Sequence, residues 1–324
     1  MKLIKNFLHN SEPLEFDIKK HLSKGKLKIT SIFLKKILRL FYKKFQRSFL
    51  KPSTRFHFKN IEKFFFQKKN IFVKNSEITE FDKNGLVILK NIFDDSQIEK
   101  ITSHLSNENN ILTPVYTNHN NFTLKKKDFG ANTGYISTDK IVQSEEIFKL
   151  VNNQKLQNIL GGIFKAKFKL DWIWSWWSFP SNEKIGPQLF HRDYESFNFV
   201  KLFVYLTDVG KENGPHEYII RSNIKDKFFE RKRFDEKQIR KEFSESDIKT
   251  IYGKKGTTFL ADTFGIHRGV HPKEENRLVL VYLFSVVPSN RSPKVPVLKF
   301  SDLSEEFRKT IKNKYIFDLF IDFN

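Results

Sequence analysis

Apolar and polar residues alternate with a period of two through much of the second half of the chain. The clearest run is KAKFKLDWIWSWWSF at 165–179, and similar runs occupy 198–209, 217–222, 256–262 and 276–287. Because successive side chains of a strand point to opposite faces, the pattern predicts five or more β-strands. In the first run, one face carries Trp172, Trp174 and Trp176 and the other carries Ile173, Trp177 and Phe179. The tryptophan face is typical of a core stripe, with an aromatic wall beside a substrate as the alternative.

The first half of the chain instead shows a period close to that of an α-helix. Residues 31–50, SIFLKKILRLFYKKFQRSFL, predict a basic amphipathic helix. Its apolar stripe consists of Leu34, Ile37, Leu38, Phe41, Phe45 and Phe49, and its other face carries Lys35, Lys36, Arg39, Lys43 and Arg47. Either the stripe packs on the main domain while the lysines are solvated, or the helix binds a membrane surface or a partner protein.

The order of the remaining elements bears on the fold class. Residues 85–105 predict a strand, a turn and a helix that starts near Asp94, and two short helices follow at 144–153 and 154–164. A charged insert at 228–251 is expected to be helical. Helices first, then strands without regular alternation, favour an α+β fold in which antiparallel strands close into a sandwich or barrel.

Charge divides the chain into two parts. The formal net charge is +21, but residues 1–75 hold 20 Lys and Arg against 4 Asp and Glu, and the remaining 249 residues hold 38 against 33. We therefore expect a basic N-terminal extension over 1–75 and a main domain over 76–324 that ends in a helical tail. The nearly balanced main domain argues against nucleic acid as a partner.

The absence of cysteines and of a recognisable targeting signal excludes several classes of protein. The sequence has no 18-residue apolar stretch and no secretory pattern at its start, so we expect a soluble, cytoplasmic protein. Peripheral attachment to a membrane through residues 31–50 stays open. The count of cysteines is 0, which excludes disulfides, thiolate nucleophiles and cysteine-ligated metals. Any metal must be held by His, Asp or Glu.

A candidate metal site begins at His191 and Asp193, just ahead of the run at 198–209. Side chains at i and i+2 of a strand point the same way, so both can reach one ion while Arg192 faces outward. Two histidines and a carboxylate suit an iron(II) ion that keeps positions open for O₂ and a cosubstrate. His267 follows a predicted strand and is the better third ligand, whereas His271 precedes a proline in a predicted turn. A polar corner between two strands is the alternative.

Further residues could line the same site. Arg277 opens the last predicted strand, and its guanidinium suits a dicarboxylate; a salt bridge to a neighbouring glutamate is the alternative. Gln188 could face the pocket or lie on a strand surface. Lys201 and Tyr205 share a face and could touch a cosubstrate, although a buried lysine needs a partner.

Three stretches together resemble one known family. They are QLFHRDYE, VKLFVYLTDVGKENGPHEYI and GTTFLADTFGIHRGVHPKEENRLVLVYLF, within residues 77–290. In this order they resemble the phytanoyl-CoA dioxygenase family of non-haem iron, 2-oxoglutarate-dependent oxygenases. The resemblance implies a double-stranded β-helix (jelly-roll) core with flanking N-terminal helices. It also implies that His191, Asp193 and His267 bind Fe(II), and that Arg277 binds the far carboxylate of 2-oxoglutarate.

The resemblance also implies an activity. It is the hydroxylation of an unactivated C–H bond of a small organic or metabolite-linked substrate by O₂, with release of succinate and CO₂. Asp193 favours hydroxylation, because related halogenases carry a small residue at that position. Gly269 replaces a hydroxyl residue that touches the cosubstrate in some members, which puts contacts there in doubt. The alternative function is a non-catalytic jelly-roll protein whose basic helix docks on a membrane or an anionic partner.

Overall fold

A computed structural model describes residues 26–67, 75–114, 120–125, 132–180 and 186–323. The side chains of residues 26–36 are not part of the description. The predicted place of Leu34, Lys35 and Lys36 on the amphipathic helix, and the predictions about the start of the chain, therefore lie outside the described residues. Within the described ranges, every helix is too short or too polar to cross a lipid bilayer.

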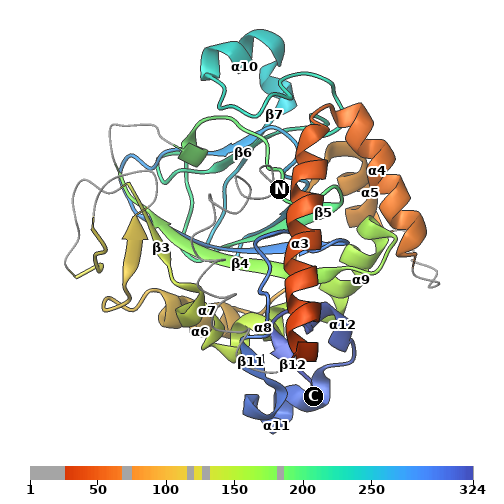
Figure 1. The fold of residues 1–324 in the computed structure, drawn as a ribbon. Helices are drawn as coiled ribbons and strands as arrows, with labels where there is room; N and C mark the ends of the chain where they lie inside the picture. Colours follow the sequence, from red (N-terminus) through yellow and green to blue (C-terminus); the bar gives the residue numbers. More distant parts are fainter. Residues whose placement is uncertain (1–25, 68–74, 115–119, 126–131, 181–185, 324) are drawn as a thin grey trace.

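Helices and strands occupy most of the described chain (Figure 1). The helices are α3 (Lys26–Ser48), α4 (Pro52–Phe65), α5 (Ser76–Asn84), α6 (Asp95–Leu105), α7 (Thr138–Val142), α8 (Glu145–Val151), α9 (Gln154–Phe164), α10 (Glu236–Glu242), α11 (Glu305–Thr310) and α12 (Lys314–Phe317), with 3-10 turns η1 (Gly186–Gln188), η2 (Glu245–Asp247) and η3 (Phe300–Asp302). The strands are β1 (Leu86–Leu89), β2 (Leu112–Pro114), β3 (Thr133–Ile136), β4 (Lys169–Ser178), β5 (Phe199–Tyr205), β6 (His216–Ile219), β7 (Ile248–Ile251), β8 (Thr258–Ala261), β9 (His267–Gly269), β10 (Arg277–Ser285), β11 (Leu298–Lys299) and β12 (Ile321–Asp322). The five strands predicted from alternation are all present, each within a few residues of its expected bounds.

Two antiparallel sheets form the centre of the domain. The larger has the order β1-β8-β5-β10-β4-β3-β2, and the smaller has the order β7-β6-β9. A bridge between His191 and His267 adds one more segment beside β9. The chain passes from the large sheet (β4) to that bridge, back to β5, across to β6 and β7, back to β8, across to β9 and finally to β10. This alternation between two sheets is a double-stranded β-helix, so the predicted α+β jelly-roll fold is confirmed.

The two faces of the large sheet have different neighbours. Leu170, Ile173 and Tyr282 on one face belong to a single apolar cluster with residues of α6, α8 and α9, such as Phe148. In Figure 1, α6 and α8 lie below the sheet and α9 lies at its right end, whereas β6 and β7 lie above it. On the upper face, residues such as Phe203 pack toward the small sheet. The helices thus fix one side of the sheet and leave the space between the two sheets for a site.

The predicted helical insert at 228–251 is mostly wrong. Only α10 is an α-helix there, and Ile248–Ile251 form strand β7, which pairs with β6. Phe234 and Phe243, the latter just after α10, are buried against Phe190. Burial of these aromatic side chains and completion of the small sheet outweigh the helix propensity of the charged residues between them.

The amphipathic helix is present, and its apolar stripe packs on the main domain only in part. Leu38 of the stripe of α3 is 57% exposed. Phe45 and Phe49 contact the ring of Phe197 in the main domain, with 5.9 Å and 6.4 Å between ring centres. Gln46 is fully buried and also bonds to the main domain. The interpretation in which the stripe packs on the main domain is therefore confirmed for Phe45 and Phe49 and not for Leu38.

A buried carboxylate joins the sheet to the segment that follows β10. Asp171 is fully buried, and its oxygens accept hydrogen bonds from the hydroxyl of Ser285 (2.6 Å), from the backbone N–H of Ser289 (2.7 Å) and from the hydroxyls of Ser289 (2.9 Å) and Ser292. Because the Asp171 carboxylate accepts so many hydrogen bonds, it holds the end of β10 and the segment that follows it against β4.

Replacement of Asp171 by alanine is expected to lower the free energy of unfolding by about 2–4 kcal/mol, because it leaves several buried donors without an acceptor. Chemical denaturation measures the change. The exposed Glu80→Ala on α5 is the control and should shift the same free energy by less than about 0.5 kcal/mol. Equal stability of the two variants would show that the Asp171 network contributes little.

Candidate metal centre

Two backbone hydrogen bonds place His191 beside His267. The N–H of His191 donates to the carbonyl of His267 (2.9 Å), and the N–H of His267 donates to the carbonyl of His191 (3.0 Å). This is the pairing of directly opposite residues in an antiparallel ladder. The centroids of the two imidazole rings are 4.3 Å apart as a result.

Both imidazoles are held in the same tautomer. Nδ1 of His191 lies 2.9 Å from the carbonyl oxygen of Leu189, and Nδ1 of His267 lies 2.9 Å from that of Gly265. Because a carbonyl oxygen only accepts, each Nδ1 carries the hydrogen and each Nε2 keeps its lone pair. Backbone carbonyls commonly orient metal-binding histidines in this way.

Asp193 completes a group of three potential ligands. Its Oδ2 lies 3.3 Å from Nε2 of His267, and its Oδ1 lies 3.8 Å from Nε2 of His191. One ligand atom from each residue lies within 4.8 Å of the others. Two imidazole nitrogens and one carboxylate on one side of a space form a donor set that suits a divalent transition metal with open positions. The residues therefore fit the ion that the sequence predicted.

The charge of Asp193 is balanced by Lys201. Burial by itself raises the pKa of the Asp193 carboxyl, but the ammonium of Lys201 and the imidazoles of His267 and His191 outweigh this and hold the pKa well below its usual value of 3.8. Nζ of Lys201 donates to Oδ2 at 2.7 Å and also lies 4.8 Å from the ring centre of Trp174. Asp193 is thus anionic near neutral pH, as a metal ligand must be.

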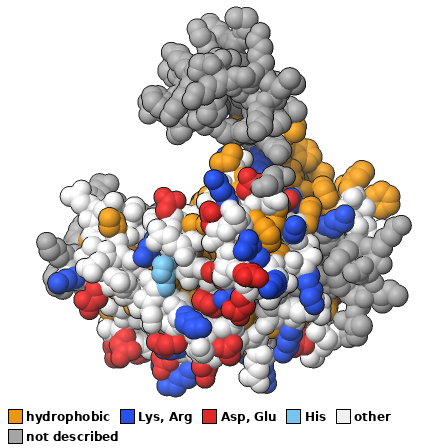
Figure 2. Space-filling view, turned by 90° about the horizontal axis from the view of Figure 1, so that it is seen from below, with side chains coloured by type: hydrophobic (Ala, Val, Ile, Leu, Met, Phe, Trp, Pro, Cys, Tyr) orange, Lys and Arg blue, Asp and Glu red, His pale blue; other side chains and the backbone are white. Residues whose placement is uncertain are grey.

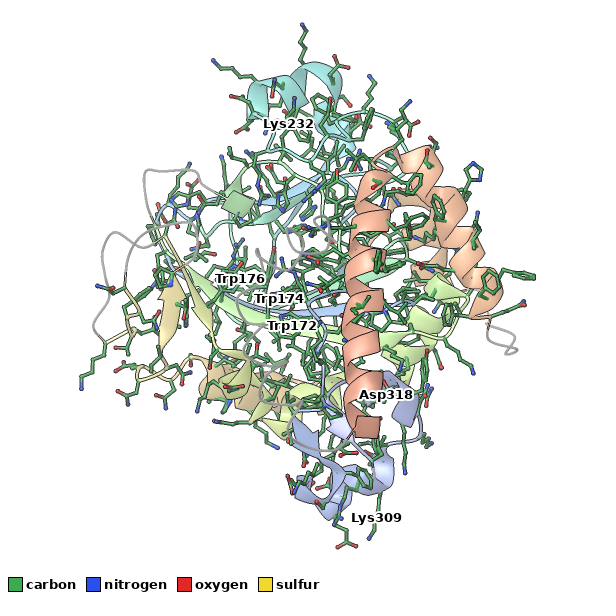
Figure 3. All side chains as sticks on the ribbon, in the orientation of Figure 1. Trp172, Trp174, Trp176, Lys232, Lys309 and Asp318 are labelled. Atoms are coloured by element: carbon green, nitrogen blue, oxygen red, sulfur yellow. The ribbon has the colours of Figure 1, made fainter. Side chains whose placement is uncertain are left out.

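A cavity of about 560 Å³ opens in front of these three residues. Trp172, Trp174 and Trp176 line it from β4, and Figure 3 shows them in a row along that strand. Tyr135 of β3 stacks on Trp176 with 5.3 Å between ring centres. The structure therefore places the tryptophan face on the cavity as an aromatic wall, rather than in the core.

Arg277 lies inside the same cavity, 6% exposed. Its Nη2 donates to the hydroxyl of Ser178 (3.1 Å), and its Nη1 donates to the carbonyl of Gly214. No carboxylate among the described residues forms an ion pair with this guanidinium, so the alternative of a salt bridge to a neighbouring glutamate is wrong. Burial lowers the pKa of the Arg277 guanidinium from its usual value, and Tyr205 and Tyr135 partly offset this effect.

Two glycines make room for Arg277. Gly214 has a φ of +74° in the turn before β6, and a Cβ there would lie 2.6 Å from the carbonyl oxygen of Val270. A Cβ on Gly269 would lie 3.0 Å from Nη2 of Arg277. A side chain at either position would disturb the guanidinium or the carbonyl that accepts from it.

The structure brings some of the other predicted residues to the cavity and not others. Gln188 of η1 and Lys201 of β5 both line it. Tyr205 is not among the lining residues, because its hydroxyl donates to the carbonyl of Ile251 (3.0 Å) and accepts from the N–H of His216 (3.0 Å). His271 is buried in the loop between β9 and β10.

The expectation that Arg192 faces outward is wrong. Its side chain is 5% exposed, and it donates to the carbonyls of Phe264 (2.6 Å), Lys227 (2.8 Å) and Phe228 (2.9 Å). It does point away from the two ligands beside it in sequence, but the segment 225–229 covers that side. Hydrogen bonds to three carbonyls offset the desolvation of the guanidinium.

His216 is a cavity residue that the sequence analysis missed. It opens β6, and its ring stacks on that of His267 with 5.5 Å between centres. Its Nε2 is buried with no hydrogen-bond partner among the described residues. Burial first, and then the nearby His267 and Arg277, lower its pKa well below 6.5. Alternation along 216–219 places His216 and Tyr218 on one face, a signal that could have identified it.

The sequence matches one known family. The model of the phytanoyl-CoA dioxygenase (PhyH) family matches residues 81–269, more than half of the chain. No curated protein matches the chain significantly.

Several solved structures resemble this chain more distantly. HygX from Streptomyces hygroscopicus, with nickel, 2-oxoglutarate and hygromycin B bound, is 14% identical, and the match covers 66% of this chain and 87% of that one with a TM-score of 0.45. EctD from S. alaskensis in its apoform is 16% identical over 67% and 79% of the two chains, with a TM-score of 0.48. The epimerase SnoN in complex with Fe3+, alpha ketoglutarate and nogalamycin RO is 12% identical over 64% and 82%, with a TM-score of 0.46. At these values the solved structures carry no argument about substrate or reaction.

The metal site predicts a loss of affinity on removal of one imidazole. His191→Ala should lower the affinity for Mn(II) or Co(II) at least ~100-fold, because only two ligands remain. Isothermal titration under anaerobic conditions measures the affinity. His57→Ala on the exposed side of α4 is the matched control and should bind the metal like the unmodified protein. Unchanged affinity of the His191 variant would place the metal elsewhere.

The metal-free protein should lose stability as the pH falls below the ordinary histidine value of 6.5. Burial and the nearby His267 lower the pKa of His191 well below 6.5, and the pKa of His216 is lowered likewise. Between 6.5 and the folded pKa values, the unfolded state therefore binds more protons, and the free energy of unfolding falls by up to about 1.4 kcal/mol per pH unit for each histidine.

Denaturation of chelator-treated protein at a series of pH values measures this slope. His216→Leu should remove about half of it, whereas the control His57→Leu should leave it unchanged. A slope that stays the same in the His216 variant would contradict the assignment.

Proposed function

This chain belongs to the phytanoyl-CoA dioxygenase family, and from that premise we propose that it is an Fe(II)- and 2-oxoglutarate-dependent oxygenase that hydroxylates an unactivated C–H bond of a small-molecule substrate. The observation that carries the proposal is one cavity that holds both a His-Asp-His group and a buried guanidinium with no carboxylate partner in the described part of the chain. When bound, Fe(II) and 2-oxoglutarate supply the means to activate O₂, with succinate and CO₂ as the coproducts.

His191, Asp193 and His267 would hold the metal. Their support is the fixed tautomer of both imidazoles and the anionic state of the carboxylate. His191 and His267 form the bridge itself, and Asp193 follows it by two residues and donates its backbone N–H to the carbonyl of Thr263 (2.9 Å). Lys201 keeps Asp193 oriented and partly neutralised, a role that differs from the cosubstrate contact expected from sequence.

Arg277 would receive the far carboxylate of 2-oxoglutarate. A buried guanidinium whose hydrogen-bond partners among the described residues are a hydroxyl and a carbonyl keeps its positive charge available for an anion. The cation is costly to bury alone, so an anionic ligand at this point stabilises the protein as well as the bound molecule. Tyr205 would not contact the cosubstrate directly, because its hydroxyl is already hydrogen-bonded to the carbonyl of Ile251 and to the N–H of His216 in β6.

The remaining part of the cavity would take the substrate. Trp172, Trp174 and Trp176 form an apolar wall that excludes water and offers flat surfaces to a ring or chain. Gln188 and the charged residues Arg233, Glu195 and Arg291 stand around the same space and would orient polar groups of the substrate. The carboxylate of Asp193 supports hydroxylation, because it occupies the position at which related halogenases keep a small residue.

We assign the reaction to residues 76–324 and treat residues 1–75 as an accessory extension. The described residues that line the cavity lie between Thr113 and Arg291. The extension would therefore determine the location of the protein and would take no part in the reaction.

The proposed function predicts metal-dependent consumption of 2-oxoglutarate. Purified protein with Fe(II), 2-oxoglutarate, ascorbate and O₂ should form succinate, and one member of a substrate panel should raise the rate and gain one oxygen atom by mass spectrometry. His191→Ala should abolish both signals. Succinate formation no greater than that of this variant across the panel would favour the non-catalytic jelly-roll alternative.

Arg277→Lys should raise the KM for 2-oxoglutarate at least ~10-fold, because an ammonium cannot form two parallel hydrogen bonds to a carboxylate. The affinity for Mn(II) without 2-oxoglutarate should stay unchanged. Arg240→Lys on the exposed side of α10 is the matched control. A KM that stays near that of the unmodified protein would assign the far carboxylate to another group.

A further inference from the structure

We propose that α3 and α4 form a docking surface for an anionic lipid membrane. The two helices, residues 26–65, are the docking pair. Polar side chains of both helices bond to the oxygenase domain, and Phe45, Phe49 and Phe58 pack around Phe197 of that domain. Other large apolar side chains of the two helices remain exposed on the outside.

The inner side of α3 is held by hydrogen bonds. Gln46 donates to the carbonyl of Tyr194 (2.6 Å), and Arg39 donates to the carbonyl of Pro293 (3.0 Å). The hydroxyl of Tyr42 lies 2.9 Å from that of Ser196. These contacts, together with the packing of Phe45 and Phe49 against the main domain, fix the rotation of α3 about its own axis and leave Leu38 exposed.

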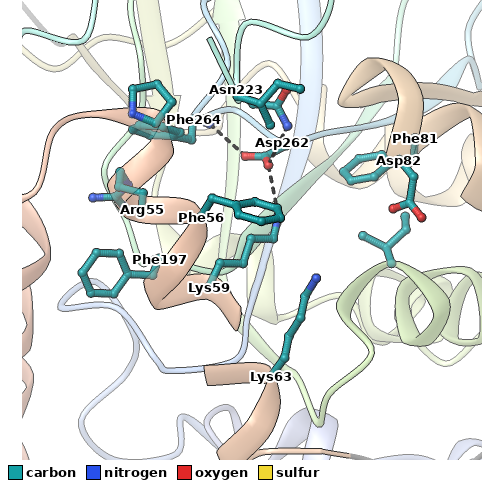
Figure 4. A pocket seen from close by; sticks show the side chains of 13 residues that line it. Arg55, Phe56, Lys59, Lys63, Phe81, Asp82, Phe197, Asn223, Asp262 and Phe264 are labelled. Atoms are coloured by element: carbon teal, nitrogen blue, oxygen red, sulfur yellow. Dashed lines mark hydrogen bonds and ion pairs between the residues drawn. The ribbon is translucent and has the colours of Figure 1, made fainter. Parts of the chain in front are cut away.

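The inner side of α4 is polar as well. Arg55 is 2% exposed and donates to the carbonyls of Gln46 (2.6 Å) and Ser196 (2.5 Å). Nζ of Lys59 pairs with Asp262 at 3.2 Å in a small pocket of about 110 Å³ (Figure 4). Like α3, this helix is therefore anchored through its charged side chains.

Large apolar side chains cover the outer side of both helices. They are Leu38 (57% exposed) and Phe45 (47%) on α3, and Phe56 (50%), Ile61 (49%), Phe64 (75%) and Phe65 (74%) on α4. Figure 2 shows hydrophobic side chains gathered toward the right of one face, the side on which α3 and α4 lie in Figure 1. Exposed apolar groups in such number mark a surface that binds something.

The positive charge of the docking pair favours an anionic membrane as its partner. Residues 26–66 contain 12 Lys and Arg and a single acid, Glu62. Glu62 is buried and bonded to the hydroxyl of Tyr42, so it does not oppose an anionic surface. Arg39, Arg55 and Lys59 bond on the inner side, whereas Lys44 and Lys51 are exposed near the apolar side chains. Such exposed cations beside aromatic rings suit the headgroup region of an anionic bilayer, where the rings enter the acyl boundary and the cations meet phosphates. Nucleic acid would use the cations but leave the phenylalanines exposed.

The docking pair also borders the cavity. Lys43 and Arg47 of α3 interact electrostatically with Glu195 and Arg291, and both of these residues line the cavity. A membrane bound to the outer side of α3 would therefore lie near the rim through which a substrate enters.

Sedimentation with vesicles tests the proposal on the full-length protein. Vesicles of phosphatidylcholine with about 30% phosphatidylglycerol should carry the protein into the pellet at low salt, and vesicles of phosphatidylcholine alone should carry much less. High salt should weaken the binding, because it screens the basic residues. Protein that stays in the supernatant with anionic vesicles at low salt overturns the proposal.

A triple variant separates the apolar contribution from the charge. Leu38→Ser, Phe64→Ser and Phe65→Ser together should lower the partition coefficient at least ~10-fold, because three exposed apolar groups no longer enter the bilayer. The matched control is Ile111→Ser with Tyr252→Ser, two residues that are 62% and 50% exposed elsewhere on the main domain. Circular dichroism and thermal unfolding check that both variants are folded.

Two results of this comparison count against lipid. Vesicle binding by the folded triple variant that equals the unmodified protein would show that charge alone is responsible. If the unmodified protein is instead a dimer that the triple variant converts to a monomer, the surface joins two copies of the chain. In either case the metal and succinate measurements are unaffected, so failure here leaves the proposed reaction standing.

Discussion

A pair of backbone hydrogen bonds between His191 and His267 is the constraint on which the site depends. The two residues are far apart in sequence, and only the alternation of the chain between two sheets brings their strands together. Because residues opposite each other in a ladder have fixed separation, the distance between the imidazoles is set by the fold rather than by the side chains. Asp193, two residues after the bridge, reaches the same point.

Electrostatics in the cavity follow from that geometry. The carboxylate of Asp193 is paired with the ammonium of Lys201, which balances its charge. Farther in, Arg277 has no such carboxylate among the described residues. The cavity thus contains one satisfied charge pair and one cation prepared for an anion, which is the asymmetry that a metal site with a dicarboxylate cosubstrate requires.

Much of this could be predicted from the sequence because period-two alternation survives in buried strands that also carry ligands. The five strands and the grouping of His191, Asp193 and His267 followed from spacing and strand ends. The sequence could not show that Tyr205 would be engaged by β6, or that Trp174 would face the cavity, since both depend on which sheet face lies toward the second sheet. The prediction that the side chain of Arg192 faces outward was wrong for a similar reason, because the segment that covers this side chain is distant in sequence.

The sequence also could not predict which side of the docking pair faces the domain. Periodicity identifies the two sides of an amphipathic helix, but which side faces the domain depends on the partners available there. Carbonyls and the hydroxyl of Ser196 offer hydrogen bonds to α3, and Phe197 offers a ring to Phe45 and Phe49. The helix therefore packs inward through both polar and aromatic side chains, while Leu38 stays exposed.

Diffraction from crystals soaked anaerobically with Mn(II) and 2-oxoglutarate tests the central claim most directly. Anomalous data at the manganese edge should show one peak within bonding distance of Nε2 of His191, Nε2 of His267 and a carboxylate oxygen of Asp193. Density for 2-oxoglutarate should extend from that peak to the guanidinium of Arg277. A manganese peak elsewhere, or 2-oxoglutarate that does not reach Arg277, would contradict this account of the cavity.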